Sequence, residues 1–313
     1  MPVIEVKNLY RDFATNRALN GLSFSVEQGE IFGLVGPDGS GKTTCLRILC
    51  GLMEASDGEV SVLGKNVFRH SESIRNEIGY MAQPAGLYDD LTVAENIEFY
   101  AALYDISPRT YRKRMQRLLA FSGLAPFSNR YFRNLSGGMK QKAGLTCALI
   151  HTPKVLFLDE PTNGVDPVSR RDFWKILYEL KREQVTIVVA STYLDEADRC
   201  HRIAMFEKGA ARLVMEPLAM RGLIEGALFN ITVSDRPAAL TLLRKLPQVK
   251  QSSVFGAGIH VLVKIPDDVT ALKQALAEGG IRLMDVEPIK PTLEDVYLSL
   301  TASDKKKSRY PGP

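Results

Sequence analysis

Residues 30–53 read EIFGLVGPDGSGKTTCLRILCGLM, and this segment carries the strongest indication of the fold class. Its first part, EIFGLVG, is almost continuously apolar, which suits a strand buried on both faces. Glycine and serine turn residues follow, and KTTCLRILCGLM then has the composition and spacing of a helix. A strand, a glycine-rich loop and a helix in this order predict the start of an α/β unit.

The loop itself, GPDGSGKTT at 36–44, satisfies the spacing G-x-x-x-x-G-K-[ST]. In this motif backbone N–H groups close around phosphate oxygens, and the following helix presents its positive end. A chance glycine turn is the alternative, but the loop lies between a buried strand and a helix, as the motif requires. Lys42 would reach the terminal phosphates and Thr43 would bind Mg²⁺. The predicted nucleotide-binding loop is Gly36, Pro37, Asp38, Gly39, Ser40, Gly41, Lys42, Thr43 and Thr44.

A second apolar strand, VLFLD at 155–159, delivers two adjacent carboxylates to its end. Asp159 suits a direct or water-mediated role at Mg²⁺, and Glu160 suits a base that polarises water for in-line attack on a γ-phosphate. Taken alone, such a pair is more often a helix N-cap or a surface feature. Together with the phosphate-binding loop, it predicts a hydrolytic site.

Between these segments lies NLSGGMKQK at 134–142, where Ser136, Gly137 and Gly138 precede a helix. A hydroxyl, free backbone N–H groups and a helix dipole make this a second anion-binding surface. By local physics alone, an N-capped helix is the better interpretation. Two phosphate-binding surfaces on one chain raise the hypothesis that each completes a site with the other's partner across a dimer.

These three segments, in this order and with a helical insertion, resemble the ATP-binding subunits of ABC transporters over about residues 3–220. The resemblance implies an α/β P-loop NTPase fold of the ABC type, with antiparallel β and helical subdomains. It implies an ATPase that takes ATP with Mg²⁺ and dimerises head to tail around two ATP molecules. In the family's terms, 36–44 is the Walker A loop, 155–160 is Walker B with Glu160 as catalytic base, and LSGGMKQK is the signature that contacts the opposite subunit's ATP.

Shorter motifs extend the resemblance. Phe13 falls where an aromatic ring stacks on adenine, Gln83 in YMAQP matches the Q-loop glutamine, and Asp166 in NGVD matches the D-loop. From the residues alone, these three are equally a core aromatic, a surface amide and a helix cap. The resemblance assigns Glu160, Gln83 and Thr192 to catalysis. It assigns Thr43, Gln83 and Asp159 to Mg²⁺, and Ser136, Gly137, Gly138 and Asp166 to the partner's ATP.

One position departs from the family pattern. In most members the strand after Walker B ends in a histidine that bonds the γ-phosphate, and aligning YLDEAD at 193–198 puts Thr192 there. Tyr193 would need a one-residue shift that reverses the strand's faces. Threonine has one short hydroxyl and no imidazole charge. We therefore expect nucleotide binding to survive and hydrolysis to be slowed, as in the weaker half of an asymmetric pair. The chain's histidines, at 70, 151, 201 and 260, are predicted to be surface or packing residues.

The domain organisation follows from changes in periodicity. Helical patterns without strands predict a helical subdomain over about 85–150 within an ATP-binding domain at 1–226. Residues 227–302 show the order β-α-β-β-α-β, which predicts a small ferredoxin-like α+β accessory domain. Residues 303–313 are predicted to be a charged tail or linker.

Three longer segments restrict the resemblance to one type of ABC transporter ATPase. GLYDDLTVAENIEFYAALY, LDEPTNGVDPVSRRDFW and PTLEDVYLSLT are similar to ATPases of ABC-2-type exporters, and closest to the N-terminal halves of tandem drug-exporter ATPases. This implies an ABC-2-type membrane permease as partner. It also implies a second ATP-binding domain, as a homodimer, a heterodimer or a fused half, and export of drugs or other hydrophobic compounds.

Composition places the chain in a cellular context. The net charge of +4 over 313 residues is too weak to argue for nucleic-acid binding, so none is expected. The four cysteines lack C-x-x-C spacing, and no apolar run approaches the roughly 20 residues of a membrane span. We expect a cytoplasmic protein, peripheral on the cytoplasmic face of the inner or plasma membrane. A nucleotide-gated regulatory subunit, and less so a nucleic-acid or ribosome ATPase, stay as alternatives.

Overall fold

The computed structural model describes residues 2–307, with side chains through 301. The chain divides into two compact units, residues 1–216 and residues from 217 onward. The sequence-based boundary at about 226 lies later than this division. The difference arises because the short helix α8 (Pro217–Arg221) packs against α11 (Leu293–Lys307) of the second unit.

A six-stranded sheet forms the centre of the first unit, in the order β10-β9-β3-β8-β7-β6. Its strands are β3 (Ile31–Val35), β6 (Ile78–Met81), β7 (Val155–Asp159), β8 (Thr186–Ser191), β9 (Arg202–Glu207) and β10 (Ala210–Met215). All pairs are parallel except the edge pair β9–β10. Every residue of β3, β7 and β8 is buried, as their apolar runs predict. The carboxyl ends of the parallel strands meet at one edge, where the loops after β3, β7, β8 and β6 converge.

A four-stranded antiparallel sheet, in the order β2-β1-β4-β5, packs on the same core. It consists of β1 (Ile4–Phe13), β2 (Asn16–Val26), β4 (Asp57–Val62) and β5 (Lys65–Asn66). Helix α1 (Lys42–Leu49) contributes Cys45, Leu46, Ile48 and Leu49 to the apolar cluster shared by both sheets. The short helix α2 (Ser71–Arg75) leads into β6. The helix after the glycine loop is thereby fixed on both sides.

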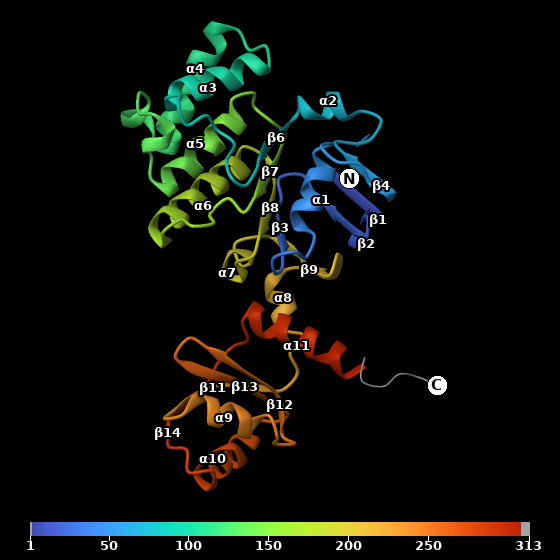
Figure 1. The fold of residues 1–313 in the computed structure, drawn as a ribbon, viewed down its shortest axis with the longest axis vertical. Coiled ribbons are helices and arrows are strands. Elements are labelled where there is room, and N and C mark those ends of the chain that lie inside the picture. Colours follow the sequence, from blue (N-terminus) through green and yellow to red (C-terminus); the bar gives the residue numbers. More distant parts are fainter. Residues whose placement is uncertain (1, 308–313) are drawn as a thin grey trace. The chain divides into compact units, whose positions relative to one another are not determined.

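Three helices form a subdomain with an apolar core of its own (Figure 1). They are α3 (Val93–Leu103), α4 (Pro108–Ser122) and α5 (Gly137–Leu149), with 3-10 turns at Ala125–Phe127 and Phe132–Asn134. Thr92 and Glu95 form a capping box at the start of α3. Helix α6 (Pro167–Arg182) connects β7 to β8 and packs against α5, and the short helix α7 (Leu194–Ala197) follows β8.

The second unit is a ferredoxin-like α+β domain. Its sheet has the order β12-β13-β11-β14, and every neighbouring pair is antiparallel. The elements are β11 (Ala227–Val233), α9 (Arg236–Leu243), β12 (Val249–Phe255), β13 (Gly258–Val263), α10 (Asp268–Glu278) and β14 (Leu283–Pro288). The predicted fold class is confirmed for both units.

The end of the chain differs from the prediction. Helix α11 continues to Lys307, so residues 303–307 of the predicted tail are helical, because the leucine-containing helix before them continues without a breaker. The rest of that predicted tail, 308–313, lies outside the described residues. In the described part of the chain, no helix is long and apolar enough to cross a membrane. All four cysteines are buried and unpaired, as expected for small apolar residues.

Candidate ATP hydrolysis site

The glycine loop after β3 is tightly packed between neighbouring strand ends. The N–H of Gly36 donates to the Ser191 carbonyl at 3.4 Å, and a Cβ placed on Gly36 would lie 2.4 Å from the Phe206 carbonyl oxygen. Gly41 has φ 105°, a conformation that residues with a side chain rarely adopt, and stands directly before α1. The loop therefore requires glycine at these two positions for steric reasons.

Lys42 is folded back over this loop. Its Nζ donates to the carbonyl oxygens of Gly36 at 2.8 Å and Pro37 at 3.0 Å, and lies 3.7 Å from Glu160 Oε1. The side chain is only 5% exposed, and burial lowers the pKa of its ammonium group. The Lys42 cation is thus held in the middle of the loop by the loop's own carbonyl oxygens.

Thr43 and Asp159 join α1 to the end of β7. The Thr43 hydroxyl donates to Asp159 Oδ1 at 2.9 Å, and burial raises the pKa of the Asp159 carboxyl. A hydroxyl and one carboxylate are hard oxygen ligands, which suit a Mg²⁺ ion that keeps waters and takes phosphate oxygens. No cluster of three or more His, Cys, Asp or Glu that would bind a metal without the nucleotide occurs among the described residues. The oxygens of Thr43 and Asp159 fit Mg²⁺ as ligands.

Glu160 occupies the centre of this edge. Its backbone φ is 48°, and its N–H donates to the Ala190 carbonyl at 2.9 Å. The carboxyl is 7% exposed, and its pKa is raised because burial outweighs the hydrogen bonds from Thr192 and the charge of Lys42. A buried carboxylate with a raised pKa beside a lysine has the properties of a general base.

Thr192 lies directly against this carboxylate. Its backbone N–H donates to Glu160 Oε2 at 3.2 Å and its hydroxyl donates to the same oxygen at 3.3 Å. The histidines lie elsewhere: His201 pairs with Ile31 at the start of β3, His151 stacks on Tyr104, and His260 pairs with Asp295 in the second unit. His70, the remaining histidine, precedes α2.

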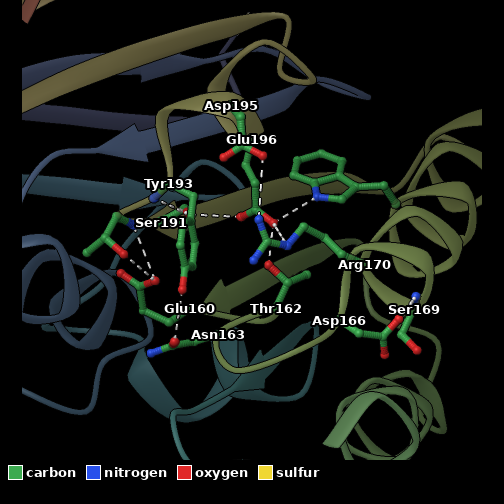
Figure 2. Close-up of polar contacts among 12 residues, drawn as sticks. Glu160, Thr162, Asn163, Asp166, Ser169, Arg170, Ser191, Tyr193, Asp195 and Glu196 are labelled. Carbon is green, nitrogen blue, oxygen red and sulfur yellow. Dashed lines mark hydrogen bonds and ion pairs between the residues drawn. The ribbon is translucent and has the colours of Figure 1, made fainter. Parts of the chain in front are cut away.

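The predicted signature and D-loop segments adjoin each other. Ser136 caps α5 by accepting from the Met139 N–H at 3.4 Å, and Asp166 caps α6 by accepting from the N–H groups of Val168 and Ser169. A Cβ on Gly138 would lie 2.6 Å from Ser169 Cβ. Ser136 and Gly137 are exposed, and Figure 2 shows Asp166 and Ser169 away from Glu160. Ser136, Gly137 and Asp166 are thus exposed at the surface, whereas Gly138 is buried against α6.

The two remaining predicted residues lie at the margins of the first unit. Phe13 ends β1 with 39% of its surface exposed, and the Arg11 guanidinium stands 4.5 Å above its ring. Gln83 is exposed in the loop that follows β6. Both side chains are accessible to a ligand, and their roles stay predictions.

Comparison with known proteins identifies the family. A family model described as "ABC transporter" matches residues 19–163. The daunorubicin resistance ATP-binding protein DrrA2 of Streptomyces coeruleorubidus is 32% identical over 304 residues, covering 95% of this chain and 94% of that protein. This chain belongs to the ABC transporter ATP-binding family.

Other relatives agree with this membership. The probable multidrug ABC transporter ATP-binding protein YbhF of Escherichia coli (strain K12) is 37% identical over 288 residues, which are 90% of this chain and 49% of YbhF. The chain thus spans about half the length of that curated relative. A solved structure of an "ATP binding subunit of ABC transporter" superposes with a TM-score of 0.64 at 28% identity, over 70% of this chain and 92% of that one. The ABC ATPase domain is an ATP-hydrolysing enzyme domain.

Sequence reasoning missed one buried feature of this ABC domain. Glu196 in α7 is 1% exposed and accepts hydrogen bonds from the side chains of Thr162, Trp174 and Ser191 (Figure 2). In sequence, YLDEAD is an acidic segment in which nothing distinguishes Glu196 from its neighbours. In the structure, Glu196 and Ala197 are buried while Asp195 is exposed to solvent.

Proposed function

We propose that this chain is the ATP-binding and ATP-hydrolysing subunit that energises an ABC-2-type membrane exporter. The observation that carries the proposal is the meeting of Lys42, the Thr43–Asp159 pair and Glu160 at one edge of the parallel sheet. The exporter assignment draws on relatives named for daunorubicin resistance and for Nod factor export. The transported compound is proposed to be a drug or another hydrophobic molecule.

The chemistry follows from the positions of these side chains. Lys42 would neutralise the terminal phosphates, and Thr43 and Asp159, with Gln83, would hold the Mg²⁺ that accompanies ATP. Mg²⁺ held by these residues would supply positive charge that stabilises the phosphates of ATP. Glu160, as a carboxylate, would accept a proton from the water that attacks the γ-phosphorus while the bond to the ADP oxygen breaks. Phe13 would stack on the adenine ring.

The site would be completed by a second ATP-binding domain. Ser136, Gly137 and Gly138 at the start of α5, and Asp166 at the start of α6, would contact the nucleotide held by the partner's Walker A loop. The exposure of Ser136, Gly137 and Asp166 supports this, because the start of a helix offers free N–H groups to an anion. The second domain would be another copy, a different chain or a fused half.

We further propose that this is the weaker site of an asymmetric pair. The Thr192 hydroxyl and N–H both donate to Glu160, so the carboxylate is held, but no imidazole reaches toward the γ-phosphate. The same observation favours one alternative function, a nucleotide-gated subunit that binds ATP and signals through dimerisation with negligible turnover. The two differ only in the hydrolysis rate.

The proposed partner is an ABC-2-type permease, with the chain bound at the cytoplasmic face of the membrane. Co-expression with a six-span permease encoded beside its gene tests this. We expect the pair to copurify in detergent and the Mg²⁺-dependent ATPase rate to rise on complex formation. Failure to bind that permease, or a rate that instead responds to DNA or RNA, would overturn the transport proposal.

A further inference from the structure

The Glu196 carboxylate is buried next to the proposed hydrolysis site, and both of its oxygens accept hydrogen bonds. Its Oε1 accepts from the Thr162 hydroxyl and, at 3.2 Å, from Trp174 Nε1, while its Oε2 accepts from the Ser191 hydroxyl at 2.8 Å. The Arg170 Nε lies 3.7 Å from Oε1 (Figure 2). Leaving a buried charge without partners is costly. The carboxylate therefore holds the Thr162, Trp174, Ser191 and Arg170 side chains in place around it.

The partners of Glu196 directly flank the reacting groups. Ser191 immediately precedes Thr192, and Thr162 follows Glu160 in the same turn. The Ser191 hydroxyl also accepts from the Tyr193 N–H at 3.0 Å, so both neighbours of Thr192 depend on one hydroxyl. Glu160 has a backbone φ of 48°, which is uncommon for a residue with a side chain and persists only with support. Glu196 links the two chain segments on which the Glu160–Thr192 contact depends.

A second layer connects this network to α6. The Arg170 guanidinium lies 4.3 Å from the centre of the Tyr193 ring, and the Tyr193 hydroxyl donates to Asn163 Oδ1 at 3.3 Å (Figure 2). Arg170 follows Ser169, the residue that packs on Gly138 of the signature. The same short piece of α6 therefore contacts both the signature helix and the residues around Glu196.

We infer that Glu196 is a positioning residue for ATP hydrolysis, which holds Thr192 against Glu160 by fixing Ser191 and Thr162. The inference rests on the proposed role of Glu160 as base. It is distinct from a purely structural role, in which Glu196 would only stabilise the attachment of α7 to the sheet.

The substitution Glu196→Gln tests the inference with little change in volume. The amide has one acceptor oxygen and one donor group, so it cannot accept from both Ser191 and the Thr162–Trp174 pair. We expect kcat for Mg²⁺-ATP to fall ~10- to 100-fold, since small displacements of reacting groups have effects of this order. We expect KM and the Kd of a fluorescent ATP analogue to stay within about twofold of wild type.

A matched control is Glu30→Gln. Glu30 is another buried carboxylate, 7% exposed, that accepts from Arg202 at 2.8 and 2.9 Å before the start of β3, at the end of the sheet away from the glycine loop. We expect this variant to lower Tm and leave kcat unchanged. A Glu196→Gln enzyme with wild-type kcat and only a lowered Tm would overturn the inference. If wild type and Glu160→Gln hydrolyse ATP at the same rate, the proposed base itself is wrong and the inference falls with it.

A spectroscopic measurement keeps the inference testable if Glu196→Gln does not fold. Trp174 is the single tryptophan of the chain, and its indole N–H donates to Glu196, so one indole ¹H–¹⁵N resonance reports on the network. We expect Thr192→Val, which removes one bond to Glu160, to shift this resonance, and Glu30→Gln to leave it in place. An unchanged indole resonance in Thr192→Val would contradict the coupling.

Discussion

Thr192 donates two hydrogen bonds to one oxygen of Glu160, from its backbone N–H at 3.2 Å and from its hydroxyl at 3.3 Å. The other oxygen of Glu160 lies 3.7 Å from the Lys42 ammonium. The proposed base is therefore held between the Lys42 ammonium and Thr192. In the proposed function, Thr192 stands where most family members have a histidine, so the group beside the base carries no positive charge.

Replacing Glu160 with glutamine should separate binding from turnover. The Glu160→Gln variant keeps the size of the side chain but cannot accept a proton, so we expect turnover to fall at least ~100-fold with little change in the Kd for Mg²⁺-ATP. We also expect ATP to accumulate in a stable dimer, visible by size-exclusion chromatography. A variant that still hydrolyses ATP at the wild-type rate would exclude Glu160 as the base.

The pH dependence of hydrolysis should reflect the raised pKa of the Glu160 carboxyl. Its pKa is raised above the ordinary value of 4.5 by burial, so the carboxyl takes up its proton at a higher pH than a free glutamate does. As pH falls, kcat should therefore begin to decline above pH 4.5. Because the Thr192 hydroxyl bond lowers this pKa, Thr192→Val should move the decline to still higher pH. If the decline of kcat at low pH does not move in Thr192→Val, the group that titrates there is not Glu160.

The contact between the signature and α6 leaves no room for a methyl group. We expect Gly138→Ala to displace α5 from α6, because the new Cβ would lie 2.6 Å from Ser169 Cβ. The cost should be about 1–3 kcal/mol of stability, together with loss of ATP-dependent dimerisation. Gly137→Ala is the matched control, since its nearest neighbour is 3.4 Å away at the Gly164 carbonyl. Equal effects of the two substitutions would argue against a steric cause.

The second unit offers a test that is independent of ATP. Asp295 accepts from the N–H and hydroxyl of Thr292 and from His260 Nδ1 at 2.9 Å, so it caps α11 and pairs a buried histidine. We expect Asp295→Ala to destabilise this unit by about 1–3 kcal/mol. Far-UV circular dichroism should show earlier unfolding, while the fluorescence of Trp174 in the first unit should melt as in wild type. A parallel shift of both signals would show that the units unfold together.

Much of the fold could be predicted because its signals are local. The buried runs of β3, β7 and β8 and the spacing of the glycine loop are properties of contiguous sequence, and so is the strand and helix order after residue 227. Strands β4 to β6 and the β9–β10 hairpin were not predicted. Their residues alternate weakly, and β4, β6 and β9 each join their sheet through a strand distant in sequence, β1, β7 and β3 respectively. The end of α11 was predicted too early because the lysines that follow the leucines look like a tail but continue the helix.

Some residues of the candidate site could likewise be predicted from the sequence, and one could not. Lys42, Thr43, Asp159 and Glu160 follow from motif spacing, and Thr192 follows from its alignment with the acidic segment. Glu196 did not follow, because its importance depends on partners from two loops and α6 that only the folded chain brings together. A charged residue in an acidic segment has no local feature that distinguishes a buried acceptor from a solvated surface group.

In the proposed function, Thr192 limits the rate of ATP hydrolysis at this site. The most direct measurement is the steady-state ATPase rate of the wild type, Thr192→His and Glu160→Gln, in the presence of the partner domain. We predict a slow wild-type rate that Thr192→His raises about tenfold or more, since one well-placed donor to developing charge is worth ~10²–10³ in kcat. Glu160→Gln should abolish the rate in both backgrounds. A wild-type rate typical of the family and unchanged by Thr192→His would contradict the claim.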